Sequence, residues 1–246
     1  MIKHYREINQ SQKLMIFVLS MSLFGLATMF SELVPSVYIG VVELSIEYFL
    51  FIPLSLAMFP GMEIDIKEKG HILVLGSIEE ILELNQELSP NKKVSDFLPF
   101  SDLLKILKNY NLILGAAHPF RPGGNIPNLK ENEIKEFDFI DLNGKDMANN
   151  KDYAINNTRK LSNTYNIPVV AGSDTHQALQ YGCTWTNFEE DINTFSKLKR
   201  EIKLENYKIQ VSQSINSQVK SAGLLKKALK EIHSLGGDYV QILLQE

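Results

Sequence analysis

The chain has 246 residues, of which 44% are hydrophobic and 22% are charged, and its formal net charge is -4. This is an ordinary globular composition, long enough for one large or two small domains, and the acidic balance argues against general nucleic-acid binding, which would need a basic patch. A single cysteine, Cys183, excludes an internal disulfide and a zinc site built from cysteines, and it fits a reducing, cytoplasmic compartment.

The first 59 residues differ from the rest, and we treat residues 1–59 and 60–246 as two regions. Residues 14–30, from Leu14 to Phe30, form an uncharged apolar run, and residues 33–59 are apolar except for two glutamates. Alone, the first run is a candidate membrane span or signal-like segment. It is at the lower limit of length for a span, and no small-x-small cleavage site follows it. We therefore expect a cytoplasmic protein, with a membrane anchor through this run as the alternative.

From Pro60 onward, strand-like and helix-like patterns alternate. Short apolar runs rich in β-branched residues predict strands over residues 62–66, 71–75, 111–118, 137–142, 167–171 and 207–211. Capped or amphipathic segments predict helices over residues 77–88, 100–110, 149–165, 189–204 and 224–235. Strands that alternate with helices in this way favour parallel pairing in an α/β fold.

Four of the strand-like runs carry a histidine or a carboxylate at or near an end. Glu63 lies in the first run, His71 opens the second and His118 ends the third. Asp174 and His176 follow directly after the run at 167–171. Ligands and catalytic groups collect at the carboxyl ends of strands in β/α folds. Imidazole nitrogens and carboxylate oxygens together suit Zn, Mn or Fe.

Each of these residues also has an ordinary structural explanation. A strand glutamate such as Glu63 usually faces solvent, and a histidine after a turn, such as His71, is commonly on the surface. His118 could be a core histidine bonded to backbone. Asp174 and His176 could form an Asx-turn followed by a surface histidine.

Four motifs, PGMEID, GHILVLG, AAHPFRPG and AGSDTH, together resemble the PHP domain, the polymerase and histidinol phosphatase family of metal-dependent phosphoesterases. The resemblance covers roughly residues 59–215. It implies a distorted (β/α)7, TIM-like barrel that holds two or three divalent metal ions (Zn, Mn or Fe) at the carboxyl ends of its strands. The metal ligands it implies are Glu63, His71, His118, Asp174 and His176.

The implied activity is hydrolysis of a small phosphate monoester or nucleotide phosphate by a metal-activated water. Glu63 would bridge the metal ions, and His118, Asp174 and His176 would complete the catalytic centre. Arg121 is a candidate for binding the substrate, because a planar guanidinium matches two phosphate oxygens. Its alternative role is a surface salt bridge.

The N-terminal region departs from the family pattern. PHP proteins typically open with a His-x-His motif and then an Asp-His motif, which supply about half of the metal ligands. Here His4 is the only histidine before His71, and no aspartate precedes Asp65. Residues 1–59 are therefore either a diverged segment or the product of a reading frame shifted upstream of Pro60. The alternative function is a catalytically impaired PHP-fold scaffold that serves in binding or regulation.

Overall fold

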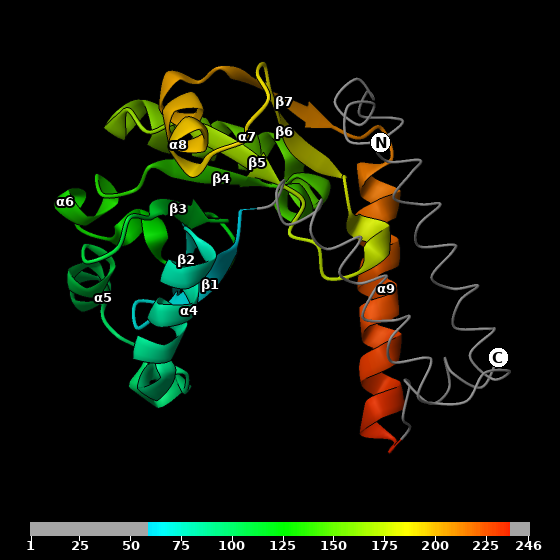
Figure 1. The fold of residues 1–246 in the computed structure, drawn as a ribbon. Coiled ribbons are helices and arrows are strands. Elements are labelled where there is room, and N and C mark those ends of the chain that lie inside the picture. Colours follow the sequence, from blue (N-terminus) through cyan, green and yellow to red (C-terminus); the bar gives the residue numbers. More distant parts are fainter. Residues whose placement is uncertain (1–58, 237–246) are drawn as a thin grey trace, which may run out of the picture. The chain divides into compact units, whose positions relative to one another are not determined.

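The computed structural model describes residues 59–236 of the chain. Strands and helices alternate along this range (Figure 1). The strands are β1 (Gly61–Ile66), β2 (Gly70–Leu75), β3 (Ile113–Ala117), β4 (Phe139–Asn143), β5 (Val169–Gly172), β6 (Thr184–Phe188) and β7 (Tyr207–Val211). The α-helices are α4 (Ile78–Glu87), α5 (Phe100–Leu107), α6 (Glu131–Ile134), α7 (Gly144–Tyr165), α8 (Phe195–Leu204) and α9 (Ile215–Ser234). Short 3₁₀ helices are η2 (Ser89–Asn91), η3 (Val94–Asp96), η4 (Ile126–Asn128) and η5 (Ala178–Gln180).

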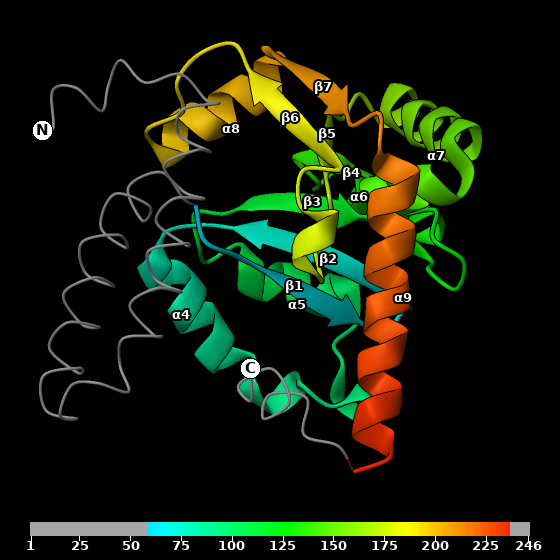
Figure 2. The ribbon, with the colours of Figure 1, turned by 90° about the vertical axis from the view of Figure 1, so that its right-hand side faces the viewer.

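Five strands form one mixed sheet in the order β1-β2-β3-β4-β5, with β1 at an edge beside β2 (Figure 2). β1, β2 and β3 pair antiparallel, whereas β3, β4 and β5 pair parallel. The turn between β1 and β2 explains the antiparallel start. Lys69 has a φ of 64°, and its N–H donates to the carbonyl oxygen of Ile66 at 3.0 Å. A turn this short can join only antiparallel strands, since parallel strands need a long crossover.

The last two strands, β6 and β7, form a separate antiparallel pair. Side chains connect this pair to β5. The Thr186 hydroxyl accepts the N–H of Ala171 at 2.8 Å and donates to the carbonyl oxygen of the same residue at 3.0 Å. The Tyr207 hydroxyl donates to the carbonyl oxygen of Val169 at 2.8 Å. These bonds hold β6 and β7 beside β5 without extending the backbone ladder.

The barrel expected from the sequence is therefore wrong. Residues 59–236 form an open five-stranded sheet and a two-stranded sheet, and no closed barrel is present among them. The short turn after β1 makes the first pair antiparallel, and β6 is joined to β5 by the side-chain bonds of Thr186 rather than by the backbone ladder. Apart from Phe59, the residues assigned to the first barrel units lie outside the described part of the chain. The division into regions 1–59 and 60–246 stays a prediction.

Helices cover both faces of the main sheet, because alternate strand residues point to opposite sides. On one face, Leu84 of α4 and Leu103 of α5 pack in a cluster with Ile72 of β2. On the other face, Ile202 of α8 packs against Phe139 of β4. Burying side chains of this size contributes about 1.5–3 kcal/mol each. The two clusters thus fix the strand ends from which the site residues project.

Within residues 59–236, no helix combines the length and the apolar character needed to cross a membrane. The run from Leu14 to Phe30, which carries the membrane alternative, lies outside this range. The cytoplasmic location and its alternative therefore stay predictions.

Candidate metal centre

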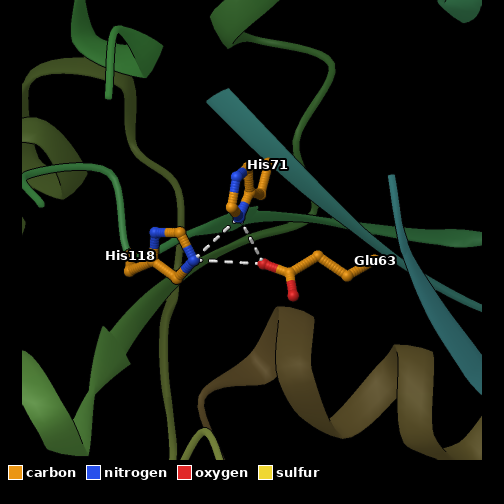
Figure 3. Close-up of side chains that lie close together, drawn as sticks. All are labelled: Glu63, His71 and His118. Atoms are coloured by element: carbon orange, nitrogen blue, oxygen red, sulfur yellow. Dashed lines mark hydrogen bonds and ion pairs between the residues drawn. The ribbon is translucent and has the colours of Figure 1, made fainter. Parts of the chain in front are cut away.

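Three side chains from neighbouring strands converge at one point, as Figure 3 shows. Glu63 comes from β1, His71 from β2, and His118 follows directly after β3. Glu63 Oε1 lies 2.8 Å from His71 Nδ1 and 3.0 Å from His118 Nε2. The two ring nitrogens are 3.2 Å apart. We call these three residues the Glu63 cluster.

Strand register brings the cluster together. His71 pairs with Asp65 of β1 on one side and with Ala117 of β3 on the other. Glu63, two residues before Asp65, points to the same face of β1 as Asp65. His118 has a φ of 28°, and its N–H donates to Asp141 Oδ2 at 3.1 Å. This bond fixes the backbone at the point where the chain leaves β3, and the His118 ring lies in contact with Glu63.

The cluster fits a divalent metal ion. One ligand atom from each residue lies within 4.8 Å of the other two. In a tetrahedral site with bonds of about 2.0 Å, ligand atoms are about 3.3 Å apart, close to the three distances in the cluster. Two imidazole nitrogens and one carboxylate oxygen form a donor set used for Zn, Mn and Fe. Among residues 59–236, the Glu63 cluster is the group of histidines and carboxylates whose ligand atoms lie this close together. These three ligands do not fix which metal is bound.

The charge state of Glu63 also favours a cation. The hydrogen bond from His118 lowers the pKa of Glu63 most, burial opposes this shift, and His71 lowers the pKa further, to about 2. Glu63 is therefore ionised at neutral pH. Behind the cluster, burial raises the pKa of Asp141 to about 6, although bonds from Asn143 and the His118 N–H oppose the shift.

Arg121 lies in a second network with carboxylates. Its Nε donates to Asp146 Oδ1 at 3.0 Å, and its Nη2 donates to Asp174 Oδ2 at 2.8 Å. Nη2 also donates to Asn143 Oδ1 at 2.9 Å, and Asn143 donates to Asp141. Burial lowers the pKa of Arg121, but its pairs with Asp174 and Asp146 outweigh this and raise it. The guanidinium that we expected to bind a phosphate is thus engaged with two carboxylates.

Gln180 of η5 holds the turn that carries Asp174 and His176. The Gln180 side chain is buried, and its Nε2 donates to the carbonyl oxygens of Ser173 at 2.7 Å and Asp174 at 2.6 Å. Asp174 has a φ of 51°, which is uncommon for a residue other than glycine. His176 is exposed, and its Nδ1 lies 3.0 Å from the Asp174 carbonyl oxygen. Gln180 therefore supports a conformation that aims the Asp174 carboxylate at Arg121.

The structure brings together three of the five expected ligands. Glu63, His71 and His118 form the cluster, whereas Asp174 pairs with Arg121 and, like His176, is not one of its members. Whether any of the five binds a metal stays a prediction.

Sequence reasoning missed three residues that organise these networks. Asp65 lies 3.1 Å from His71, Asp146 pairs with Arg121, and Gln180 holds the 173–176 turn. The position of Asp65 could have been found from the alternation in MEID, which puts Glu63 and Asp65 on the same face. No local pattern distinguishes Gln180 or Asp146.

A cavity of about 230 Å³ opens beside the cluster. Glu63 and Asp65 line it from β1, and Asn85 and Lys92 line it from α4 and the segment after η2. The Lys92 ammonium group donates to Asn85 Oδ1 at 2.9 Å. The cavity therefore offers a small ligand carboxylates on one side and an ammonium group on another.

Two family models match parts of this chain. One, described as PHP-associated, matches residues 154–206, and a family of unknown function (DUF8171) matches residues 15–63. The first supports the PHP resemblance over the part of the chain from α7 to α8. The second means that the N-terminal segment recurs in other proteins, which is not expected of a chance out-of-frame peptide. Neither model covers half of the chain.

Solved structures match as well. PsfC from Pseudomonas syringae matches with a TM-score of 0.52 and 18% identity, over 70% of this chain and 66% of that chain. PfuEndoQ, a lesion-specific endonuclease from Pyrococcus furiosus, matches with a TM-score of 0.44 and 15% identity, over 61% and 40%. An endonuclease Q complex with a 27-mer duplex substrate bearing an abasic lesion matches with a TM-score of 0.41 and 17% identity, over 58% and 38%.

These identities indicate likeness of fold alone. The chain spans less than two thirds of the length of each of these three proteins. No curated protein matches it.

One expectation about partners is wrong on this comparison. The acidic composition led us to expect no general nucleic-acid binding, yet two of the matching structures are DNA endonucleases. Net charge describes the whole surface, whereas a bound metal ion can reverse the sign of the local field at a site. The composition therefore does not exclude a nucleic acid as partner.

Proposed function

We propose that the protein hydrolyses a phosphate ester with a divalent metal ion held by Glu63, His71 and His118. The observation that carries the proposal is the convergence of their three ligand atoms at 2.8–3.2 Å from one another. The PHP-associated match over residues 154–206 supports the same class of hydrolase. The cavity reaches one member of the cluster, Glu63.

In the reaction, a water oxygen attacks phosphorus, the bond from phosphorus to the leaving oxygen breaks, and the leaving oxygen takes up a proton. A divalent ion, when bound, would supply a Lewis acid for the phosphoryl oxygens and lower the pKa of water. Glu63, whose pKa is lowered to about 2, would contribute a negative charge to the site at neutral pH. The two histidines would contribute nitrogen ligands.

The roles expected for the remaining residues belong to this proposal. Asp174 and His176 would act as further ligands, and Arg121 would bind the substrate phosphate. Both roles require the ion pair between Arg121 and Asp174 to open. A phosphate can replace the carboxylate at the guanidinium, because both groups can present two oxygens to the N–H donors of its planar fork.

The test measures metal content and hydrolysis on the full chain. Purified protein, loaded with Zn or Mn, is assayed with p-nitrophenyl phosphate and with the p-nitrophenyl ester of thymidine 5′-monophosphate. We expect release of p-nitrophenol from one of them and about one ion or more per chain by mass spectrometry. The two substrates distinguish a phosphomonoesterase from an enzyme that cleaves nucleotide diesters.

Glu63→Gln is the informative variant, and Glu79→Gln on the exposed first turn of α4 is its matched control. Loss of a residue that only hydrogen-bonds a metal ligand costs roughly 10- to 100-fold in activity. Glu63→Gln removes a proposed ligand itself, so its activity should fall by more than that. Equal activity of Glu63→Gln and the control would refute the role of the cluster.

The impaired scaffold is the second candidate. It is favoured by the number of ligands in the Glu63 cluster. Three ligand atoms within residues 59–236 are fewer than two or three metal ions require. Metal bound by the wild type without turnover of either substrate would support it.

A further inference from the structure

Both ring nitrogens of His71 face a carboxylate. On one side, Nδ1 lies 2.8 Å from Glu63 Oε1 and 3.2 Å from His118 Nε2. On the other side, Nε2 lies 3.1 Å from Asp65 Oδ1. Asp65 is not a member of the Glu63 cluster, and its carboxylate contacts the cluster at His71.

Glu63 and Asp65 compete for the proton of a neutral His71, and a cation in the Glu63 cluster would settle the competition, because it needs the Nδ1 lone pair. A neutral imidazole carries one N–H, and an ionised carboxylate can only accept a hydrogen bond. With the proton on Nε2, the N–H faces the Asp65 carboxylate, and the Nδ1 lone pair is directed at Glu63 and His118, where a cation would lie between it and the Glu63 oxygen. With the proton on Nδ1, the Nε2 lone pair would face the Asp65 oxygen at 3.1 Å.

We propose that Asp65 is a positioning residue that holds His71 in the Nε2–H tautomer and so makes Nδ1 a metal ligand. This inference rests on the metal site of the proposed function and adds a residue to it. A carboxylate behind a histidine ligand fixes both the tautomer and the orientation of the ring.

Strand pairing builds this arrangement into the fold. Asp65 and His71 are direct partners in the antiparallel register of β1 and β2. Directly opposite side chains in such a pair have Cβ atoms about 4.5–5.5 Å apart. The Asp65 side chain is half exposed, at 52%, so its carboxylate is not a buried structural group. Replacing it should leave the sheet intact.

The first measurement is the affinity for Zn, determined by competition with a chromophoric chelator on the full chain. Asp65→Asn should bind Zn roughly 10- to 100-fold more weakly than the wild type. Asp102→Asn is the control, because Asp102 is also half exposed and pairs with Lys105 at 2.7 Å without a histidine. The control removes the same charge and should bind as the wild type does.

The second measurement reads the tautomer directly by ¹⁵N-edited NMR of the imidazole rings. The chain has five histidines, so His71 can be assigned by its loss in His71→Gln. At pH 8.5 we expect the Nε2–H form in Zn-loaded wild type, and a smaller share of the Nε2–H form in metal-free Asp65→Asn than in metal-free wild type. A purely structural role for Asp65 would not change this spectrum.

The outcomes separate the two proposals. If the wild type binds no Zn, the metal site of the proposed function fails, and the metal-free spectrum still decides whether Asp65 sets the tautomer. If the wild type binds Zn but His71 carries its proton on Nδ1, the inference is overturned. Equal affinity and an unchanged tautomer in Asp65→Asn would also overturn it.

Discussion

Gln180→Met should weaken the turn over residues 173–176 by an amount that the structure defines. Gln180 is 4% exposed, so methionine, an unbranched chain of similar length, fills the same space but lacks the two N–H donors. Two short hydrogen bonds of about 0.5–1.5 kcal/mol each are lost, together with a long one of 3.5 Å from the His176 N–H to Gln180 Oε1. Both carbonyl oxygens keep another contact, since His176 Nδ1 lies 3.0 Å from the Asp174 oxygen and Cys183 Sγ lies 3.7 Å from the Ser173 oxygen. We therefore expect a loss of about 2 kcal/mol in the free energy of unfolding.

The assay is thermal unfolding of the full chain followed by tryptophan fluorescence. Trp185, the only tryptophan, lies in β6 and so reports on the part of the chain that contains the turn. For a domain of about 150–250 residues, about 2 kcal/mol lowers the melting temperature by about 4–8 °C.

Gln177→Met is the control for this prediction. Gln177 precedes η5, and its side chain makes no capping hydrogen bond there. This variant should melt within about 1 °C of the wild type. An equal shift in both variants, or none in either, would refute the role assigned to Gln180.

Three further predictions concern the sheet, a helix cap and the metal. Gly115→Ala should destabilise the protein by about 1–3 kcal/mol, because the added Cβ would overlap the ring of Phe139, whereas Gly223→Ala in α9, with nothing within 4 Å, should be neutral or slightly stabilising. Equal melting temperatures of these variants would contradict the packing of β3 on β4. Ser77→Ala should cost about 0.5–2 kcal/mol, seen as a lower urea midpoint, because the Ser77 hydroxyl caps α4; an unchanged midpoint would argue against the cap. Zn at about 100 times its Kd should stabilise the protein by about 2.7 kcal/mol, and a chelator should reverse the rise in melting temperature. No rise in wild type would count against the cluster as a metal site.

Local signals in the sequence predicted several elements well. Ser77 followed by Glu80 predicted a capped helix, and both reciprocal bonds of the capping box are present at 3.2 Å. The first two strands were also predicted within one or two residues of their observed bounds. Such signals depend only on neighbours along the chain, which is why they can be found without the fold.

Elements with weaker local signals were missed or misplaced. Strand β6, Thr184–Phe188, was not predicted, and the helix expected from residue 189 begins at Phe195 with Thr194 as its N-cap. Helix α9 was expected from residue 224, but it begins at Ile215. Its first turns are rich in polar residues, and packing against η5 and α7 supports them. Tertiary contacts of this kind override local propensity.

Two predictions failed because the sequence does not show the direction in which a strand runs or a side chain points. The alternation of strands and helices favoured parallel strands, and the family resemblance implied a barrel, but the turn at Lys69 forces the first pair to run antiparallel. Likewise, the spacing of Asp174 and His176 predicted two ligands for one ion. The left-handed backbone at Asp174 instead directs its carboxylate to Arg121. Neither a backbone dihedral nor a distant partner can be read from residue spacing.

The origin of the Glu63 cluster has a consequence for folding. Its three residues come from β1, β2 and the end of β3, which are successive antiparallel neighbours. An ion bound by all three would cross-link these strands, and its binding energy would add to their stability against local opening. The effect should be largest at β1, which is an edge strand of the main sheet within residues 59–236. Metal loading should therefore slow amide hydrogen exchange in β1 and β2 more than in β6 and β7. The cation would then stabilise one edge of the main sheet against local unfolding.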